Sequence, residues 1–139
     1  MTYLQQQQHL SNKRAQAALA ELFGVALSEG GQACIAGRAG QAAQALTDAL
    51  RDEIRRSAVV NSDETGARVD GRTWWEWVFR GGATVLDVIR PSRAVDVIEE
   101  VMGAARVGTR VCDCWNPPLN APAARFQLCL AHQIRNLQD

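Results

Sequence analysis

Two aspartates, Asp63 and Asp113, are the clearest candidates for chemistry, because each lies at the end of a short strand-like segment, at 58–63 and at 109–113. Magnesium prefers hard oxygen ligands such as carboxylates. Two acids that converge from the ends of adjacent strands could share a metal ion and so serve phosphoryl transfer. Taken alone, Asp63 is equally compatible with a turn-capping aspartate before Gly66. The metal-site hypothesis therefore depends on the pair.

A second group of candidate residues lies near the C-terminus. Cys129 and His132 are three residues apart in a predicted helix and so share one face, with Arg135 a turn further on. They could shape a site or contact a ligand, or they could form an ordinary half-buried helix face. Together with Cys112 and Cys114 they have the ligand count of a structural zinc site. We do not expect zinc, because those two cysteines project from the side of the strand opposite the neighbouring aspartate.

Composition limits the classes of protein to consider. A chain of 139 residues suits one compact domain, or one small domain with a helical extension. Lys and Arg together number 15, as do Asp and Glu, so no strongly basic surface is evident, which counts against nucleic-acid binding by the chain alone. No run approaches the roughly 20 apolar residues of a membrane span. The opening Met1-Thr2-Tyr3-Leu4 does not have the order of a signal peptide, so we expect a reducing cytoplasm and no membrane partner.

Residues 1–57 read as a helical segment. Ser11 is placed to cap a helix that ends at Gly24, and Ser28 to cap a second helix that runs to Arg56. Glycines weaken the first half of the second helix, so its firmer part begins at Gln41. The pair resembles a helix-turn-helix. Few side chains of its second helix could read base edges, so sequence-specific reading of DNA is not expected.

Residues 58–139 read as a mixed α/β domain. The predicted elements are three strands at 58–63, 72–79 and 85–89, a helix from Arg93 to Ala105, a strand from Thr109 to Asp113, a loop at 116–122 and a helix at 124–137. Asp70-Gly71 is a hairpin turn signal. A strand, helix and strand in succession imply a parallel, right-handed crossover. This is the order in which a ribonuclease-H-like fold begins, here without its fifth strand and the helix after it, so we expect the fold to be incomplete at the C-terminus.

Other conspicuous residues have simpler interpretations. The second strand contains three tryptophans, at 74, 75 and 77. Tryptophans in such a strand could stack on bases, but they more often cover a core, and we expect a core role here. Glu64 should point to the face opposite Asp63 and be a supporting or surface residue. Glu99 and Glu100 most simply form a solvated helix face, although one of them could face a metal site.

Several motifs resemble one family. They are Ser62-Asp63-Glu64-Thr65-Gly66, Trp74-Trp75-Glu76-Trp77-Val78-Phe79, Val88-Ile89-Arg90-Pro91-Ser92-Arg93, Cys112-Asp113-Cys114-Trp115 and Gln127-Leu128-Cys129-Leu130-Ala131-His132. In order and spacing they closely resemble the central, catalytic domain of insertion-sequence family sixty-six transposases. The resemblance covers almost the whole chain, including its glutamine-rich opening and first helix pair.

The resemblance implies a DDE-type DNA transposase, in which three carboxylates hold two divalent metal ions, Mg²⁺ or Mn²⁺. It implies that Asp63 is the first carboxylate and Asp113 the second, and that Cys129, His132 and Arg135 support the site or contact DNA. The third carboxylate, a glutamate further downstream in the family, has no matching position here, and neither do the family's N-terminal zinc-binding and coiled segments. The chain therefore resembles a truncated member.

Two functions are compatible with this resemblance. An intact enzyme would cleave and join the ends of its insertion sequence by two-metal phosphoryl transfer, with the element ends and target DNA as partners, in the cytoplasm and associated with the nucleoid. The alternative is a catalytically inactive remnant that acts only as a protein- or DNA-interaction module and associates with full-length transposase. The missing third carboxylate leaves open whether the chain itself is an enzyme.

Overall fold

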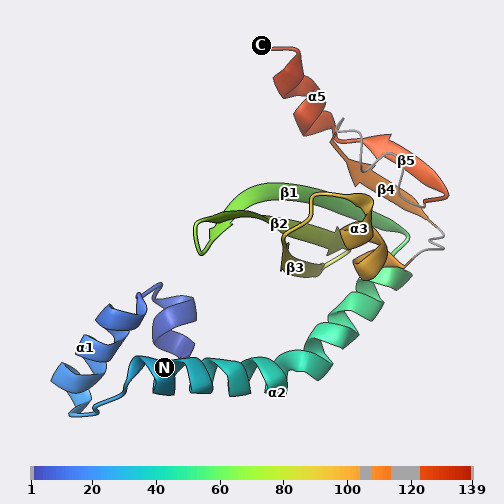
Figure 1. The fold of residues 1–139 in the computed structure, drawn as a ribbon. Coiled ribbons are helices and arrows are strands. Elements are labelled where there is room, and N and C mark those ends of the chain that lie inside the picture. Colours follow the sequence, from blue (N-terminus) through green and yellow to red (C-terminus); the bar gives the residue numbers. More distant parts are fainter. Residues whose placement is uncertain (1, 104–107, 114–122, 139) are drawn as a thin grey trace. The chain divides into compact units, whose positions relative to one another are not determined.

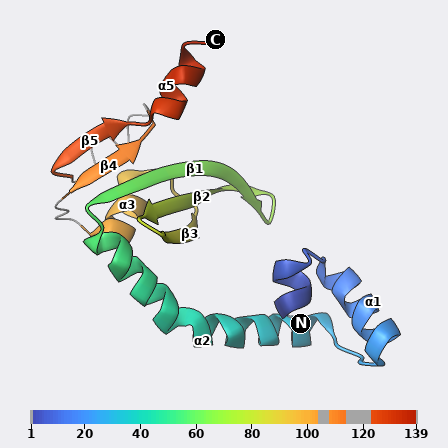
Figure 2. The same ribbon diagram turned by 180° about the vertical axis from the view of Figure 1, so that it is seen from behind.

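The computed structural model describes residues 2–103, 108–113 and 123–138. The chain divides into two compact units, Met1–Leu46 and Thr47–Asp139 (Figures 1 and 2). The division falls within one long helix, so the last turns of that helix belong with the second unit. The predicted domain boundary after residue 57 lies just beyond the end of this helix and stays a prediction.

The first unit is helical, as its sequence predicts. It contains η1 (Tyr3–Gln7), α1 (Asn12–Phe23) and the first part of α2 (Glu29–Arg56). The Ser11 hydroxyl accepts a hydrogen bond from a backbone N–H of the first turn of α1, and Gly24 ends that helix in the left-handed conformation. The Ser28 hydroxyl accepts from the Gly31 N–H at 3.1 Å, at the start of α2. The predicted helix ends are therefore confirmed, whereas the π-helical turn η1 was not predicted.

The second unit is built on a five-stranded sheet with the order β3-β2-β1-β4-β5 (Figure 1). Its strands are β1 (Val59–Val69), β2 (Arg72–Gly81), β3 (Thr84–Arg90), β4 (Thr109–Cys112) and β5 (Arg125–Leu128). The first three form an antiparallel meander, β4 runs parallel to β1, and β5 runs parallel to β4. The predicted mixed α/β architecture is confirmed, and the strand order is consistent with a ribonuclease-H-like arrangement.

The C-terminal part differs from the sequence prediction. We expected one helix over 124–137 and no fifth strand, but residues 125–128 form β5, and only Leu130–Asn136 form a helix, α5. Phe126 and Leu128 alternate with polar residues, and a run this short does not distinguish a strand from a helix by periodicity. Parallel pairing with β4 decides in favour of the strand. The predicted loop at 116–122 lies outside the described residues.

The hairpin between β1 and β2 fixes the register of the sheet. Asp70 and Gly71 have φ angles of 48° and 73°, which are the left-handed values that a two-residue type I′ turn requires at both positions. Because the turn is this tight, Val69 pairs with Arg72, and the same register brings Asp63 opposite Val78. The strand β1 thus extends past the residue at which we expected it to end.

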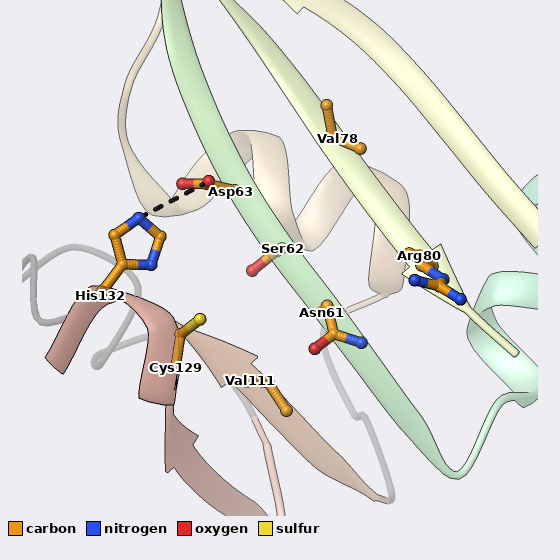
Figure 3. Close-up of a pocket in the computed structure, with 8 residues that line it drawn as sticks. All are labelled: Asn61, Ser62, Asp63, Val78, Arg80, Val111, Cys129 and His132. Atoms are coloured by element: carbon orange, nitrogen blue, oxygen red, sulfur yellow. Dashed lines mark ion pairs between the residues drawn. The ribbon is translucent and has the colours of Figure 1, made fainter. Parts of the chain in front are cut away.

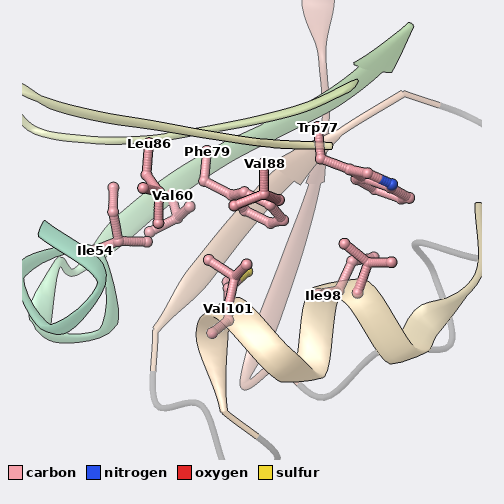
Figure 4. Packing of buried hydrophobic residues seen from close by; sticks show 10 residues of the cluster. Ile54, Val60, Trp77, Phe79, Leu86, Val88, Ile98 and Val101 are labelled. Atoms are coloured by element: carbon pink, nitrogen blue, oxygen red, sulfur yellow. The ribbon is translucent and has the colours of Figure 1, made fainter. Parts of the chain in front are cut away.

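One face of the sheet is covered by α3 (Val95–Met102), and the core lies between them (Figure 4). Trp77 and Phe79 are fully buried there with their rings 6.1 Å apart. Burial of each such large side chain contributes about 1.5–3 kcal/mol. The predicted core role of the tryptophans is confirmed for Trp77 and for the partly buried Trp75. The helix starts later than the predicted Arg93, and its buried residues are Val97, Ile98, Val101 and Met102.

The C-terminal end of α2 packs against this core. Ile54 is fully buried among the core residues. Arg55 donates hydrogen bonds to the carbonyls of Val101 and Glu100, both at 2.9 Å, and so caps the C-terminal end of α3. The chain then passes so close to β2 that a Cβ added at Gly81 would lie 2.7 Å from the Cβ of Ser57. These contacts fix where β1 begins.

Candidate functional site

The two candidate aspartates lie just past the paired stretch of the neighbouring strands β1 and β4. Adjacent β1 and β4 are parallel, and Asn61 pairs with Val111 in their register. Asp113 lies one residue past the end of β4, and alternation along β1 places Asp63 on the same face of the sheet as Asn61. That face is opposite α3, because Val60, one residue before Asn61, belongs to the core under α3. Both aspartates therefore lie two residues past the last residue pair of β1 and β4.

A cavity of about 230 Å³ opens on this face beside Asp63 (Figure 3). It is lined by Asn61, Ser62, Asp63, Val78, Arg80, Val111, Cys129 and His132. The imidazole Nε2 of His132 lies 3.8 Å from Oδ2 of Asp63. Because α5 starts directly after Cys129, the N-terminal end of that helix carries both Cys129 and His132 to the cavity.

The Asp63 carboxylate is held on one side and open on the other. Its Oδ1 accepts a hydrogen bond of 3.0 Å from the backbone N–H of Glu64. Its side chain is 58% exposed, whereas that of His132 is 23% exposed. One oxygen is therefore fixed by the backbone, and the other faces His132 and solvent, where it could contact a cation.

The remaining predicted residues are distributed over both faces. Arg135 lies on α5 and is exposed. Cys112 is buried and shares the α3 face with Arg110, whose partner in β1 is the core residue Val60. It therefore lies on the other side of the sheet from Cys129, and Cys114 lies outside the described residues. Within residues 2–103, 108–113 and 123–138, no three His, Cys, Asp or Glu side chains are grouped to hold a metal ion.

Five residues that line the cavity were not among the candidates chosen from the sequence, namely Asn61, Ser62, Val78, Arg80 and Val111. A signal for two of them was present. A two-residue Asp-Gly turn sets the register of the whole hairpin, and counting back from it places Val78 opposite Asp63 and Arg80 opposite Asn61. The position of Val111 in the cavity could not be predicted without knowing that β4 lies next to β1.

Behind the site, on the α3 face, Glu64 is buried. Its side chain is 2% exposed and accepts a hydrogen bond of 2.8 Å from Nε of Arg93. The Arg93 guanidinium lies over the Trp75 ring at 4.5 Å. Burial raises the pKa of Glu64, and the hydrogen bond and charge of Arg93 partly offset this. The predicted orientation away from Asp63 is confirmed, and of the two roles considered for Glu64, a surface position is excluded.

A second cation lies on the same side. Arg110 is fully buried, with its guanidinium 5.5 Å from the centre of the Phe126 ring. Burial lowers the pKa of Arg110, while Cys112 and the carboxylates of Glu64 and Asp113 act in the opposite direction. By contrast, Glu100 pairs with Arg90 and lies on α3, so it does not share the face of Asp63.

The sequence profile of the Transposase IS66 family matches residues 1–139. The chain belongs to the IS66 family of transposases. The match covers its whole length, so the resemblance seen in its motifs is confirmed, and with it a role in insertion-sequence transposition. No curated protein and no solved structure shows significant similarity to the chain. In the part that the structure describes, no helix is long and apolar enough to cross a membrane.

Proposed function

We propose that this chain forms part of the catalytic region of a DDE-type transposase, in which Asp63 and Asp113 bind a divalent metal ion, Mg²⁺ or Mn²⁺. The observation that supports this most strongly is the parallel register of β1 and β4, because Asp63 and Asp113 each lie two residues past its last pair, Asn61 and Val111. Structural aspartates that merely cap turns have no reason to coincide in this way.

The available donors fit a hard cation. Carboxylate oxygens are the ligands that Mg²⁺ and Mn²⁺ prefer, and the open oxygen of Asp63 is accessible from solvent. Asn61 adds an amide to the same cavity. In the intact enzyme, bound ions would activate the attacking oxygen and stabilise the leaving oxygen of an in-line phosphoryl transfer.

The other side chains around Asp63 would contact DNA or support the Asp63 carboxylate. Arg80 lines the cavity and carries a positive charge, which suits contact with a phosphate. His132 would orient the Asp63 carboxylate from the side opposite the Glu64 N–H. Cys129 would pack beside them, and exposed Arg135 would contact the DNA backbone. The substrate would be the ends of the insertion sequence and a target DNA.

A second candidate function is a non-catalytic module that pairs with full-length transposase. Within the described residues no three His, Cys, Asp or Glu side chains are grouped to hold a metal ion, and the formal charge of the chain is zero. Both favour an interaction role for the chain on its own, because few ligands hold metals poorly and a neutral surface attracts little DNA.

Mn²⁺ binding to the purified chain, followed by electron paramagnetic resonance, tests the proposal. The variants are Asp63→Asn, Asp113→Asn and their double mutant. Asp70→Asn, in the hairpin turn, is the matched control because it removes the same charge at a distance from the site. We expect each single change to weaken Mn²⁺ binding and the double change to add little more, since the ligands act together. If the two single variants and the double mutant bound Mn²⁺ as tightly as the Asp70→Asn control, a shared site would be ruled out.

A further inference from the structure

The buried position of Glu64 calls for an explanation. A carboxylate removed from water is costly even when paired, and the Glu64 side chain is only 2% exposed. Its partner Arg93 is held in turn by stacking on Trp75 at 4.5 Å. These three residues, which we call the Glu64 cluster, connect β1 and β2 with the segment that leads into α3. The nearby indole N–H of Trp77 donates to the carbonyl of Ser92 at 3.1 Å, which ties the same segment down.

The cluster lies directly behind Asp63. Glu64 follows Asp63 in the chain, and its backbone N–H is the donor to Asp63 Oδ1 at 3.0 Å. Rotation of the peptide between the two residues would therefore turn the carboxylate. The paired register of β1 with β4 ends at Asn61 and Val111, so this peptide lies past the last residue pair on that side. At this point the hydrogen bond between the Glu64 side chain and Arg93 restrains the peptide.

We propose that the Glu64 cluster positions the Asp63 carboxylate for metal binding. Glu64 is then a positioning residue and contacts neither metal nor substrate. The inference rests on the proposed function, because it assumes that Asp63 is a metal ligand. If the Glu64–Arg93 pair only stabilised the fold, its loss would lower the unfolding temperature and leave the affinity of the folded protein for metal unchanged.

Mn²⁺ affinity of the folded chain separates these possibilities. Glu64→Ala removes the hydrogen bond with Arg93, whereas Glu64→Gln keeps an oxygen that accepts it. Residues that orient metal ligands typically alter metal affinity by about 10- to 100-fold when mutated. We expect Glu64→Ala to weaken Mn²⁺ binding about tenfold and Glu64→Gln to stay within about twofold of wild type. Glu100→Gln is the control, since it also breaks a Glu–Arg pair but one that does not touch Asp63.

Each outcome decides the question. Equal affinity of Glu64→Ala and wild type would overturn the inference, and so would equal weakening by Ala and Gln, which would indicate an effect of charge rather than position. If Glu64→Ala does not fold, Arg93→Lys replaces it, because Lys keeps the charge but loses the planar stack on Trp75. Weaker Mn²⁺ binding by Arg93→Lys then supports the inference, and unchanged binding refutes it. Asp63→Asn is measured in parallel, and its failure to weaken binding would refute the proposed function itself.

Discussion

Asp63 and Glu64 show how neighbouring residues of like charge acquire different surroundings. The strand turns one side chain to the open face and the other to the core. Asp63 is 58% exposed, whereas Glu64 is buried and paired with Arg93. The sequence predicted this division of faces, because alternation along a strand is a local property. It could not show that Glu64 is buried, since the position of Arg93 depends on how the β3–α3 connection crosses the sheet.

The raised pKa of Glu64 predicts a pH dependence of stability. Burial raises the pKa above its ordinary 4.5, so between pH 4.5 and the folded-state pKa the folded chain binds more protons than the unfolded chain. The contribution of Glu64 to the free energy of unfolding therefore falls as pH rises through this window. We expect urea unfolding of wild type, compared with Glu64→Gln, to show this relative loss. The free energy of unfolding of wild type minus that of Glu64→Gln should therefore decrease as pH rises. A value of this difference that stays constant or increases with pH would contradict the prediction.

Arg80 is the cavity residue with the clearest predicted role toward DNA. If it contacts a phosphate, Arg80→Gln should weaken binding of duplex DNA and lower the slope of log affinity against log salt by about one. Fluorescence anisotropy over a series of salt concentrations measures both. Arg72→Gln is the matched control, because Arg72 is exposed in the same strand beside the hairpin turn. Equal effects of the two substitutions would show a nonspecific loss of charge.

At the scale of elements, local signals predicted well and long-range pairing did not. Ser11, Ser28 and the Asp70-Gly71 turn act within a few residues, so helix starts and the hairpin were predictable. The strand β5 was not, because its four residues become a strand only by pairing with β4. The same limit applies to the site. The acids could be selected from sequence, but the approach of His132 to Asp63 depends on where α5 begins.

The junction between α2 and the sheet gives a prediction about stability. A methyl group at Gly81 would lie 2.7 Å from the Ser57 Cβ, and both are backbone-near atoms that move little. Gly81→Ala should therefore lower the free energy of unfolding by about 1–3 kcal/mol, as overpacking does. Gly66→Ala, in β1, is the control because nothing lies within 4 Å of an added Cβ there. Urea midpoints of the two variants that coincide would argue against this close contact.

At the scale of the whole molecule, the sequence predicted a family and a mixed α/β fold, and both are confirmed by the match over residues 1–139 and by the five-stranded sheet. The two compact units meet within α2, which no break in sequence pattern marks. The recognised motifs singled out the two acids, whereas their matching positions past the last residue pair of β1 and β4 depend on a pairing that the sequence does not show.

The chain on its own should neither cleave nor join insertion-sequence ends at a useful rate. Transition-state stabilisation needs pre-organised ligands, and the described residues contain no group of three His, Cys, Asp or Glu side chains that could hold a metal ion. An element-end cleavage assay with Mg²⁺ or Mn²⁺ measures this. Cleavage that disappears in Asp63→Ala would mean that another residue supplies a third ligand. Glu99 and Glu100 would be poor choices for it, because α3 covers the face opposite Asp63.

The central claim is that Asp63 and Asp113 bind one divalent metal on the open face of the sheet. The most direct test is the pattern of Mn²⁺-induced broadening of backbone amide resonances in the ¹⁵N-labelled chain, because paramagnetic broadening falls steeply with distance from the ion. We predict early and selective loss of the amide signals of Asp63, Asp113 and Cys129, persistence of those of α3, and no selective loss in the Asp63→Asn, Asp113→Asn double mutant. Broadening centred elsewhere, or unchanged by the double substitution, would contradict the account.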